Sequence, residues 1–136
     1  MNEKIIEQAN YFLNEDVNGY DISPDAILNH LQSIHGKSED WDEGDLSDRI
    51  YRYDHYDSLS DIPMNKLNPE EWYIDEDYVD ELVDMIKSNG GKYAPVVVGE
   101  DPPYSNYTII DGGHRINALQ KMGYTSVHGY IGRLKN

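Results

Sequence analysis

The residues of this chain best suited to chemistry lie together in the run Asp111-Gly112-Gly113-His114-Arg115. The residues before this run, YTII, are typical of a strand, and those after it, INALQKM, have helical spacing. Two glycines at the end of a strand let backbone N–H groups reach a ligand, and a helix that begins there adds unpaired donors and a positive dipole end. The junction therefore predicts an anion site, in which the flat, charged fork of Arg115 is suited to phosphate.

Two further side chains of this junction could act on a bound phosphate. His114 could donate a hydrogen bond or move a proton near neutral pH. Asp111 is the only acid in the last 35 residues, and beside an anion site it could hold a metal ion or activate an attacking hydroxyl. The spacing matches neither a Walker A loop nor a dinucleotide fingerprint. The simpler readings are a tight turn at the two glycines, a helix cap at Asp111 and an ion pair between Arg115 and the acidic first half of the chain.

The first half of the chain has the pattern of helices joined by acidic segments. Apolar spacing predicts a helix over Asn2–Leu13. A second helix is expected to begin at the N-cap Ser23, with a proline in its first position, and to end at Gly36. Residues 37–48 are acidic and poor in apolar side chains, which predicts an exposed loop. Residues 50–56, IYRYDHY, suit an edge strand or a helical turn, with their tyrosines packed between the helices and a sheet.

The second half alternates strands and helices, which predicts an α+β fold. The first strand contains Pro63, which favours the edge of a sheet, and Asp75 can cap the helix after it. The expected strands are residues 58–67, 94–99, 107–110 and 126–131, and the expected helices are residues 76–89 and 114–122. We therefore expect a small mixed sheet with helices packed on it over residues 58–136, preceded by an acidic helical extension over residues 1–57.

The longest informative stretch is P-V-V-V followed by Y-T-I-I-D-G-G-H-R-I-N-A-L-Q-K-M-G-Y-T-S-V-H-G-Y-I. Together with the earlier I-P-M-N-K-L-N-P and Y-V-D-E-L-V-D-M-I-K-S-N-G-G, it resembles the ParB N-terminal/sulfiredoxin-like superfamily over about Ser58–Arg133. The resemblance implies a nucleotide site, because members use a Gly-x-His-Arg or Gly-Glu-Arg-Arg turn to hold the phosphates of ATP, ADP or CTP. Some members are phosphotransferases, some are nucleotide switches in DNA segregation, and some are reported as nucleases.

The departures from the family pattern narrow what the resemblance implies. Gly113 stands where sulfiredoxin has its catalytic cysteine, and the chain has no cysteine, so reductase chemistry is excluded. The nearest variant is the Asp-Gly-His-His-Arg turn of kinase-like members, with Gly113 in place of the first histidine. The resemblance then implies that Gly112, Gly113, His114 and Arg115 bind the phosphates, while Asp111 acts on Mg²⁺ or on the nucleophile.

A kinase-like reaction also needs a second acid, to hold Mg²⁺ or to accept a proton. Glu70 and Glu71, just after the first strand, are the first candidates, and Glu100 is the next. The activity expected from the resemblance is an Mg²⁺-dependent NTP hydrolase or phosphotransferase that uses ATP, ADP or CTP.

The charge of the chain supports a second hypothesis from another class. Asp and Glu number 26 against 11 Lys and Arg, and the formal net charge is -15. This charge disfavours direct binding to DNA or to an anionic membrane, and no apolar run is long enough for a membrane span, so a soluble, cytoplasmic protein is expected. The acidic residues 37–48 and 70–84 are either a solvated surface or a mimic of a phosphate backbone. In the second case the protein is a non-catalytic inhibitor, of the kind a mobile element encodes, that binds a basic site on a partner protein.

Overall fold

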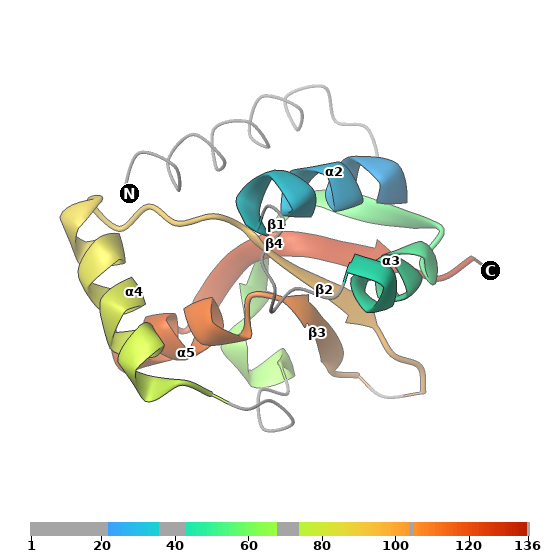
Figure 1. Ribbon diagram of the computed structural model, residues 1–136. Coiled ribbons are helices and arrows are strands. Elements are labelled where there is room, and N and C mark those ends of the chain that lie inside the picture. Colours follow the sequence, from blue (N-terminus) through green and yellow to red (C-terminus); the bar gives the residue numbers. More distant parts are fainter. Residues whose placement is uncertain (1–21, 36–42, 68–73, 104, 136) are drawn as a thin grey trace.

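A computed structural model describes residues 22–35, 43–67, 74–103 and 105–135 (Figure 1). The helices are α2 (Pro24–His35), α3 (Glu43–Tyr51), α4 (Glu76–Ser88) and α5 (Gly113–Lys121). The strands are β1 (His55–Pro63), β2 (Val96–Glu100), β3 (Tyr107–Asp111) and β4 (Ser126–Arg133), and a short 3-10 turn covers Met64–Lys66. The predicted helix over Asn2–Leu13 lies outside the described residues.

The strands form one mixed sheet in the order β1-β4-β2-β3. β2 runs parallel to β4, and the other two pairs are antiparallel. β1 ends at Pro63 and lies at one edge of the sheet, as the proline predicted. β3 lies at the other edge, so the strand that ends at Asp111 has a neighbouring strand on one side only within the sheet.

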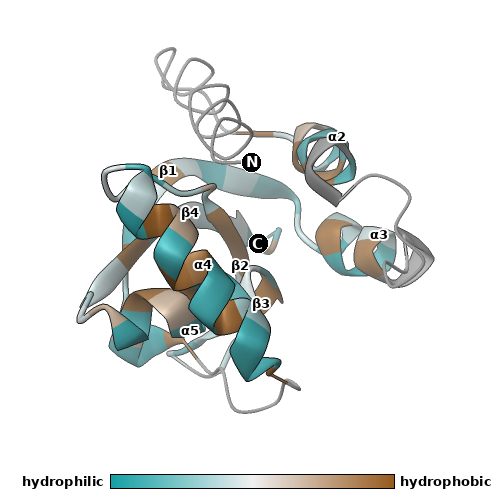
Figure 2. Cartoon of the chain, turned by 60° about the vertical axis from the view of Figure 1, so that its left-hand side comes forward, coloured by the Kyte–Doolittle hydropathy of each residue, from teal (hydrophilic) through white to brown (hydrophobic). Residues whose placement is uncertain are grey.

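Helices cover both faces of this sheet (Figure 1). Each face of the sheet has its own hydrophobic core, because successive side chains of β2 point to opposite faces. Val96 and Val98 pack with α4 and α5, whereas Val97 packs with α2 and α3. In Figure 2 the hydrophobic residues of α4 form a stripe with hydrophilic residues around it. Val79, Leu82 and Ile86 of this helix are buried. The expected α+β architecture, a small mixed sheet with packed helices, is confirmed.

The prediction of an exposed loop over residues 37–48 is wrong at its end, because α3 begins at Glu43. Leu46 and Ile50 stand four residues apart, on one face of this helix, and are 6% and 0% exposed. Each contributes roughly 1.5–3 kcal/mol when fully buried, which outweighs the poor helix propensity of the polar residues around them. Residues 36–42 lie outside the described part of the chain.

The tyrosines of residues 50–56 pack largely as expected. Tyr53 and Tyr56 are buried between the N-terminal helices and the sheet, whereas Tyr51 ends α3 and donates a hydrogen bond to Asp25. The ring of Tyr53 lies over two glycines of the sheet, and a Cβ at Gly99 would come within 2.1 Å of it. Residues 50–56 supply both the last turn of α3 and the start of β1.

Most of the remaining boundaries lie close to those predicted, but β1 covers His55–Pro63 and not residues 58–67, because the chain enters a 3-10 turn at Met64. Ser23 accepts a hydrogen bond from the Ala26 N–H at 3.2 Å and so caps α2. Asp75 is the N-cap of α4, and β4 runs two residues beyond the predicted end, to Arg133. None of the helices in the described part of the chain is long and apolar enough to cross a bilayer. The division into residues 1–57 and 58–136 stays a prediction.

Candidate functional site at the start of helix α5

The two glycines after β3 have different structural roles. Gly112 has φ +108°, and a Cβ there would lie 2.6 Å from Cγ1 of Val96, so the turn requires glycine. Gly113 is the first residue of α5, and a Cβ there would meet nothing within 4 Å. Gly112 therefore makes the turn between strand and helix, while Gly113 leaves open space at the first turn of the helix.

The N-terminus of α5 has the features of an anion site. Gly112 is its N-cap and has no side chain, no side chain caps the helix, and its first turn holds no acid. By contrast, Oδ1 of Asp75 caps α4 by accepting hydrogen bonds from the N–H groups of Asp77 and Tyr78, at 3.1 and 3.3 Å. Uncapped first-turn N–H groups and the positive end of the helix dipole favour a bound anion at α5.

Arg115 and Asp111 form an ion pair across the glycine turn. Nη2 of Arg115 lies 2.7 Å from Oδ2 of Asp111, and the two side chains are 10% and 12% exposed. The pair ties the last residue of β3 to the first turn of α5. Removing one partner of such a buried pair is strongly destabilising, because a buried charge is left uncompensated. The simpler readings of these residues are therefore wrong: the helix cap is Gly112, and Arg115 pairs within the junction itself.

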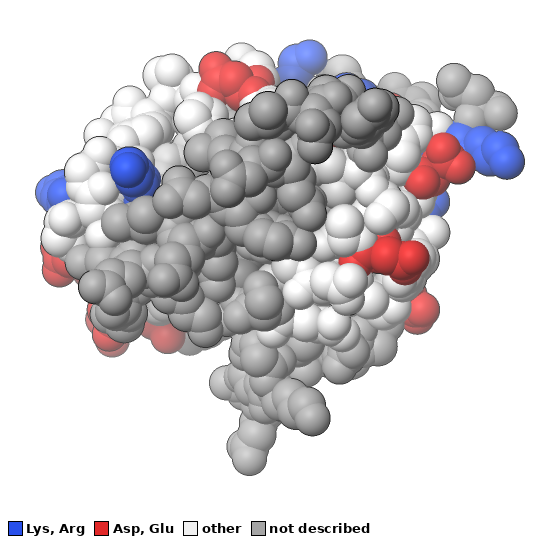
Figure 3. Space-filling model, turned by 90° about the horizontal axis from the view of Figure 1, so that it is seen from above, with Lys and Arg blue, Asp and Glu red and all other residues white. Residues whose placement is uncertain are grey.

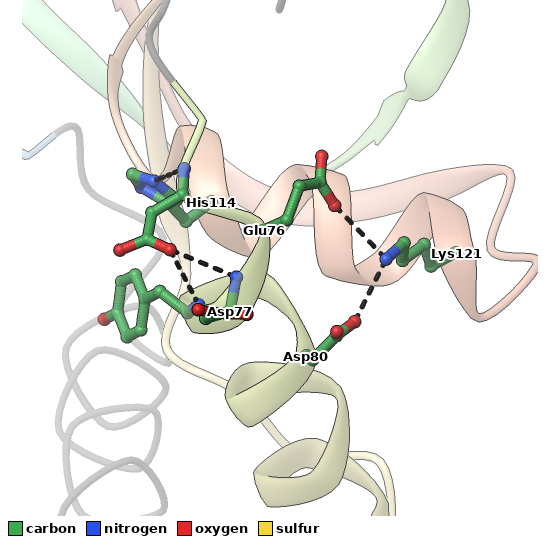
Figure 4. A network of polar contacts seen from close by, with 7 residues as sticks. Glu76, Asp77, Asp80, His114 and Lys121 are labelled. Atoms are coloured by element: carbon green, nitrogen blue, oxygen red, sulfur yellow. Dashed lines mark hydrogen bonds and ion pairs between the residues drawn. The ribbon is translucent and has the colours of Figure 1, made fainter.

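His114 joins the starts of two helices. Its Nε2 accepts a hydrogen bond from the backbone N–H of Asp75 at 3.1 Å, and its ring lies against that of Tyr78 with centroids 5.1 Å apart (Figure 4). Because the backbone N–H can only donate, Nε2 carries no proton in this arrangement, and a neutral ring carries its proton on Nδ1. The contact places α4 beside the candidate anion site.

Lys121 strengthens the same helix pair at the other end of α5. Its Nζ lies 3.2 Å from Glu76 and 3.0 Å from Asp80 on α4 (Figure 4). The pKa of Lys121 is raised, first by the hydrogen bond to Asp80 and then by that to Glu76. Nδ2 of Asn117 donates to the carbonyl of Gly113 at 2.8 Å, which orients the first turn of α5 further.

Three of the four Lys and Arg residues in the last 35 residues lie against acids, and the fourth, Lys135, is exposed. Arg115 and Lys121 are paired as described above, and Arg133 contacts Asp57 at 2.8 Å and Glu100 at 3.3 Å. An anion at α5 would therefore be held mainly by backbone N–H groups and the helix dipole.

The acids expected to assist Asp111 do not meet it in the described structure. Glu100 lies opposite Tyr107, at the far end of β3, where it accepts hydrogen bonds from Arg133 and from the Leu134 N–H. Glu70 and Glu71 lie outside the described residues. Within the described ranges there is no group of three or more His, Asp or Glu residues that could hold a metal. A magnesium ion at Asp111 would take its other ligands from bound phosphates, water or residues outside the described part of the chain.

A cavity of about 320 Å³ lies away from this junction, around the connection between β2 and β3. It is lined by Lys66, Glu100, Asp101, Pro102, Pro103, Ser105, Asn106, Tyr107 and Arg133. Tyr107 and Asp111 stand at opposite ends of β3, so this cavity is separate from the start of α5.

Sequence reasoning missed two features of the site. One is the contact of His114 with Asp75, which joins residues 39 apart in the chain and has no local signature. The other is the pairing of Asp111 with Arg115. Asp111 belongs to β3 and Arg115 to α5, so the rule for residues four apart on one helix does not predict this pair.

The ParB/sulfiredoxin-like fold is defined by a mixed sheet with two helices on one face. A glycine turn leads from an edge strand of this sheet into the second helix. The chain belongs to the ParB N-terminal domain family, whose model matches residues 52–136. Over 70 residues the chain is 33% identical to the ATP-dependent L-serine kinase of Staphylothermus marinus, and this match covers 52% of the chain and 27% of the kinase. It thus spans little more than a quarter of that curated relative.

Several solved structures align with part of this chain. A variant of a free serine kinase in complex with AMP aligns with a TM-score of 0.51 at 23% identity, over 54% of this chain and 30% of that one. Sulfiredoxin from Arabidopsis thaliana aligns with a TM-score of 0.47 at 27% identity, over 55% and 84%. The truncated partitioning protein ParB from Caulobacter crescentus, complexed with CTP-gamma-S, aligns with a TM-score of 0.47 at 24% identity, over 57% and 46%.

Proposed function

We propose that this protein binds the phosphate groups of a nucleotide at the start of α5. The observation that carries the proposal is the uncapped N-terminus of α5 beside the open space at Gly113. The backbone of Gly112, Gly113 and His114 would supply donors. Arg115 would add its charge while it remains bound to Asp111 through Nη2. The proposal is supported by family membership and by relatives whose names or complexes include ATP, AMP, ADP or CTP-gamma-S.

The same site is proposed to act on the bound nucleotide as an NTP hydrolase or phosphotransferase. Magnesium would neutralise phosphate charge when bound, and Asp111 is the residue that we propose would hold it. His114 would act through Nδ1, because Nε2 already accepts the Asp75 N–H. In the neutral ring Nδ1 is a donor, which suits a contact to a phosphate oxygen. Glu70 and Glu71 remain the candidates for a second acid, and ATP, ADP and CTP the candidate nucleotides.

Isothermal titration calorimetry tests the binding proposal. Protein shown to be folded by circular dichroism would be titrated with ATP, ADP and CTP, each with and without Mg²⁺. We expect saturable heat with at least one nucleotide and release of inorganic phosphate, or its transfer to an acceptor, with the same one. The absence of heat with all three would refute nucleotide binding, whereas heat without turnover would refute only the enzymatic part.

The alternative proposal, a non-catalytic acidic protein that binds a basic partner, draws on α4. Asp77, Glu81 and Asp84 are exposed on this helix. Among the acids of α4 in the described structure, Lys121 contacts only Glu76 and Asp80. On the face shown in Figure 3, however, the described acidic residues form small separate groups with Lys and Arg residues in other places on that face. A pull-down at low and high salt would favour this alternative if one partner is lost at high salt and is retained by Arg115→Ala.

A further inference from the structure

The strand that delivers the glycine turn is irregular just before the turn. β3 pairs with β2 through Val98 opposite Ile109 and Val97 opposite Asp111. Ile110 is therefore an extra residue on β3 and forms a β-bulge. A bulge interrupts the ladder locally and re-aims the side chains that follow it. The direction in which Asp111 and the glycines point depends on what holds Ile110.

Helix α3 holds this bulge from outside the sheet. Ile110 is 4% exposed and belongs to the same core as Leu46 and Ile50 of α3. Val97, the partner of Asp111 in the ladder, belongs to that core as well. The bulge is thus packed by residues of the N-terminal helices.

Arg49 adds a polar contact at the same place. It stands in the last turn of α3, and its Nη2 donates a hydrogen bond to the carbonyl of Ile109, the residue before the bulge. Because β3 is an edge strand, it has no further strand of the sheet to fix its outer side. Arg49 thus binds the backbone of the edge strand two residues before Asp111.

We propose that α2 and α3 form a positioning element for the α5 site, and that Arg49 is its principal positioning residue. The family match begins at residue 52, so Arg49 and both helices lie outside it. This positioning element fixes the Ile110 bulge, and the bulge sets the direction of the Asp111 side chain. The ion pair between Asp111 and Arg115 then orients the first turn of α5. The part of this inference that concerns ligand binding rests on the proposed function, whereas the part that concerns the geometry of the turn does not.

The test compares Arg49→Met and Arg49→Lys with Arg52→Met as a matched control. Arg52 lies three residues further along, and its side chain is 57% exposed. It approaches Asp101 at 3.9 Å and the ring of Tyr53 at 5.8 Å, so its loss removes the same charge without removing a hydrogen bond to the β3 backbone. Hydrogen exchange would be measured without ligand over residues 109–113 and over β4. Nucleotide affinity would be measured by calorimetry at a temperature where circular dichroism shows each variant folded.

We expect Arg49→Met to raise exchange on the order of tenfold at residues 109–113, with β4 unchanged, and to weaken nucleotide binding by a similar factor. Arg49→Lys should recover part of both effects, and Arg52→Met should show neither. A uniform rise in exchange over β3 and β4, or unchanged exchange at residues 109–113, would overturn the inference. If Arg49→Met does not fold, the same comparison of exchange at residues 109–113 with exchange in β4 is made on Arg49→Lys, and its result supports or overturns the inference.

Two outcomes separate this inference from the proposed function. If the wild-type protein binds no nucleotide, the proposed function fails, and local exchange alone still supports or overturns the positioning role. If the wild type binds and Arg49→Met binds equally well, the positioning role is overturned while the proposed function stands.

Discussion

Replacing Gly113 by Asp should both stabilise the protein and weaken anion binding more than a hundredfold. Gly113 has no neighbour within 4 Å of an added Cβ and its φ is not positive, so a side chain fits there without strain. Helix α5 has no acid in its first turn, and a carboxylate there interacts favourably with the helix dipole by about 0.3–1 kcal/mol. The same carboxylate would occupy the place proposed for phosphate.

The magnitudes can be estimated against Gly113→Asn, which has nearly the same shape without the charge. Both variants gain from the loss of glycine flexibility, so the difference between them isolates the charge. We expect Asp to melt roughly 1–4 °C above Asn in the absence of ligand. A carboxylate about 5 Å from a phosphate charge costs about 3 kcal/mol at an effective dielectric constant of about 20, which is more than a hundredfold in affinity.

Differential scanning calorimetry without ligand and isothermal titration with the nucleotide that binds the wild type measure the two effects. The expected result is a higher melting temperature for Asp than for Asn, together with a much weaker affinity. If Gly113→Asp binds nucleotide as tightly as Gly113→Asn, the phosphates do not lie at the start of α5.

Three further predictions follow from the junction and the tyrosines. Gly112→Ala should lower the free energy of unfolding by at least about 2 kcal/mol in urea titrations, because φ +108° strains an L-residue and the new Cβ would lie 2.6 Å from Val96; a loss below 0.5 kcal/mol, on the order of a neutral surface change, would contradict this. Arg115→Met should cost about 3 kcal/mol by the same measurement, and adding Asp111→Leu should restore part of it, because the stranded carboxylate is removed; no recovery in the double variant would count against the buried pair as the cause. Burial raises the pKa of Tyr53, Tyr56 and Tyr93 above the ordinary 10.0, so the folded protein keeps protons that the unfolded chain releases. The free energy of unfolding should therefore be unaffected by these groups below pH 10.0 and fall as the pH rises above it. The part of the tyrosinate absorbance that is lost in Tyr56→Phe should appear only above that pH in the folded protein, and its appearance at or below pH 10.0 would disprove the reasoning.

The helices and strands with strong local signals were predicted well from the sequence. Ser23 and Asp75 cap α2 and α4 where expected, and Pro63 lies in an edge strand as predicted, although this strand ends at the proline and not at residue 67. Helix α3 was missed because it has only two large aliphatic residues, Leu46 and Ile50, among several acids. These two residues stabilise the helix only by packing against a sheet that is distant in the sequence.

In the candidate site, too, local features were predicted from the sequence and long-range contacts were not. The glycine turn was visible as a motif, and Gly112 has the left-handed backbone expected for it. The last 35 residues hold four Lys and Arg against one acid, but folding places Arg115, Lys121 and Arg133 against acids, each of them from another element. Which charges remain open is decided by long-range packing, and no spacing rule contains that information.

The central claim is that nucleotide phosphates bind at the start of α5. Amide chemical-shift mapping on isotope-labelled protein tests it most directly, by titrating ATP, ADP and CTP with Mg²⁺. The account predicts that the largest saturable shifts fall on the N–H groups of Gly113, His114 and Arg115, with a smaller shift at Asp75 through its contact with His114. Saturable shifts confined to other parts of the chain, or no shifts with any of the three nucleotides, would contradict it.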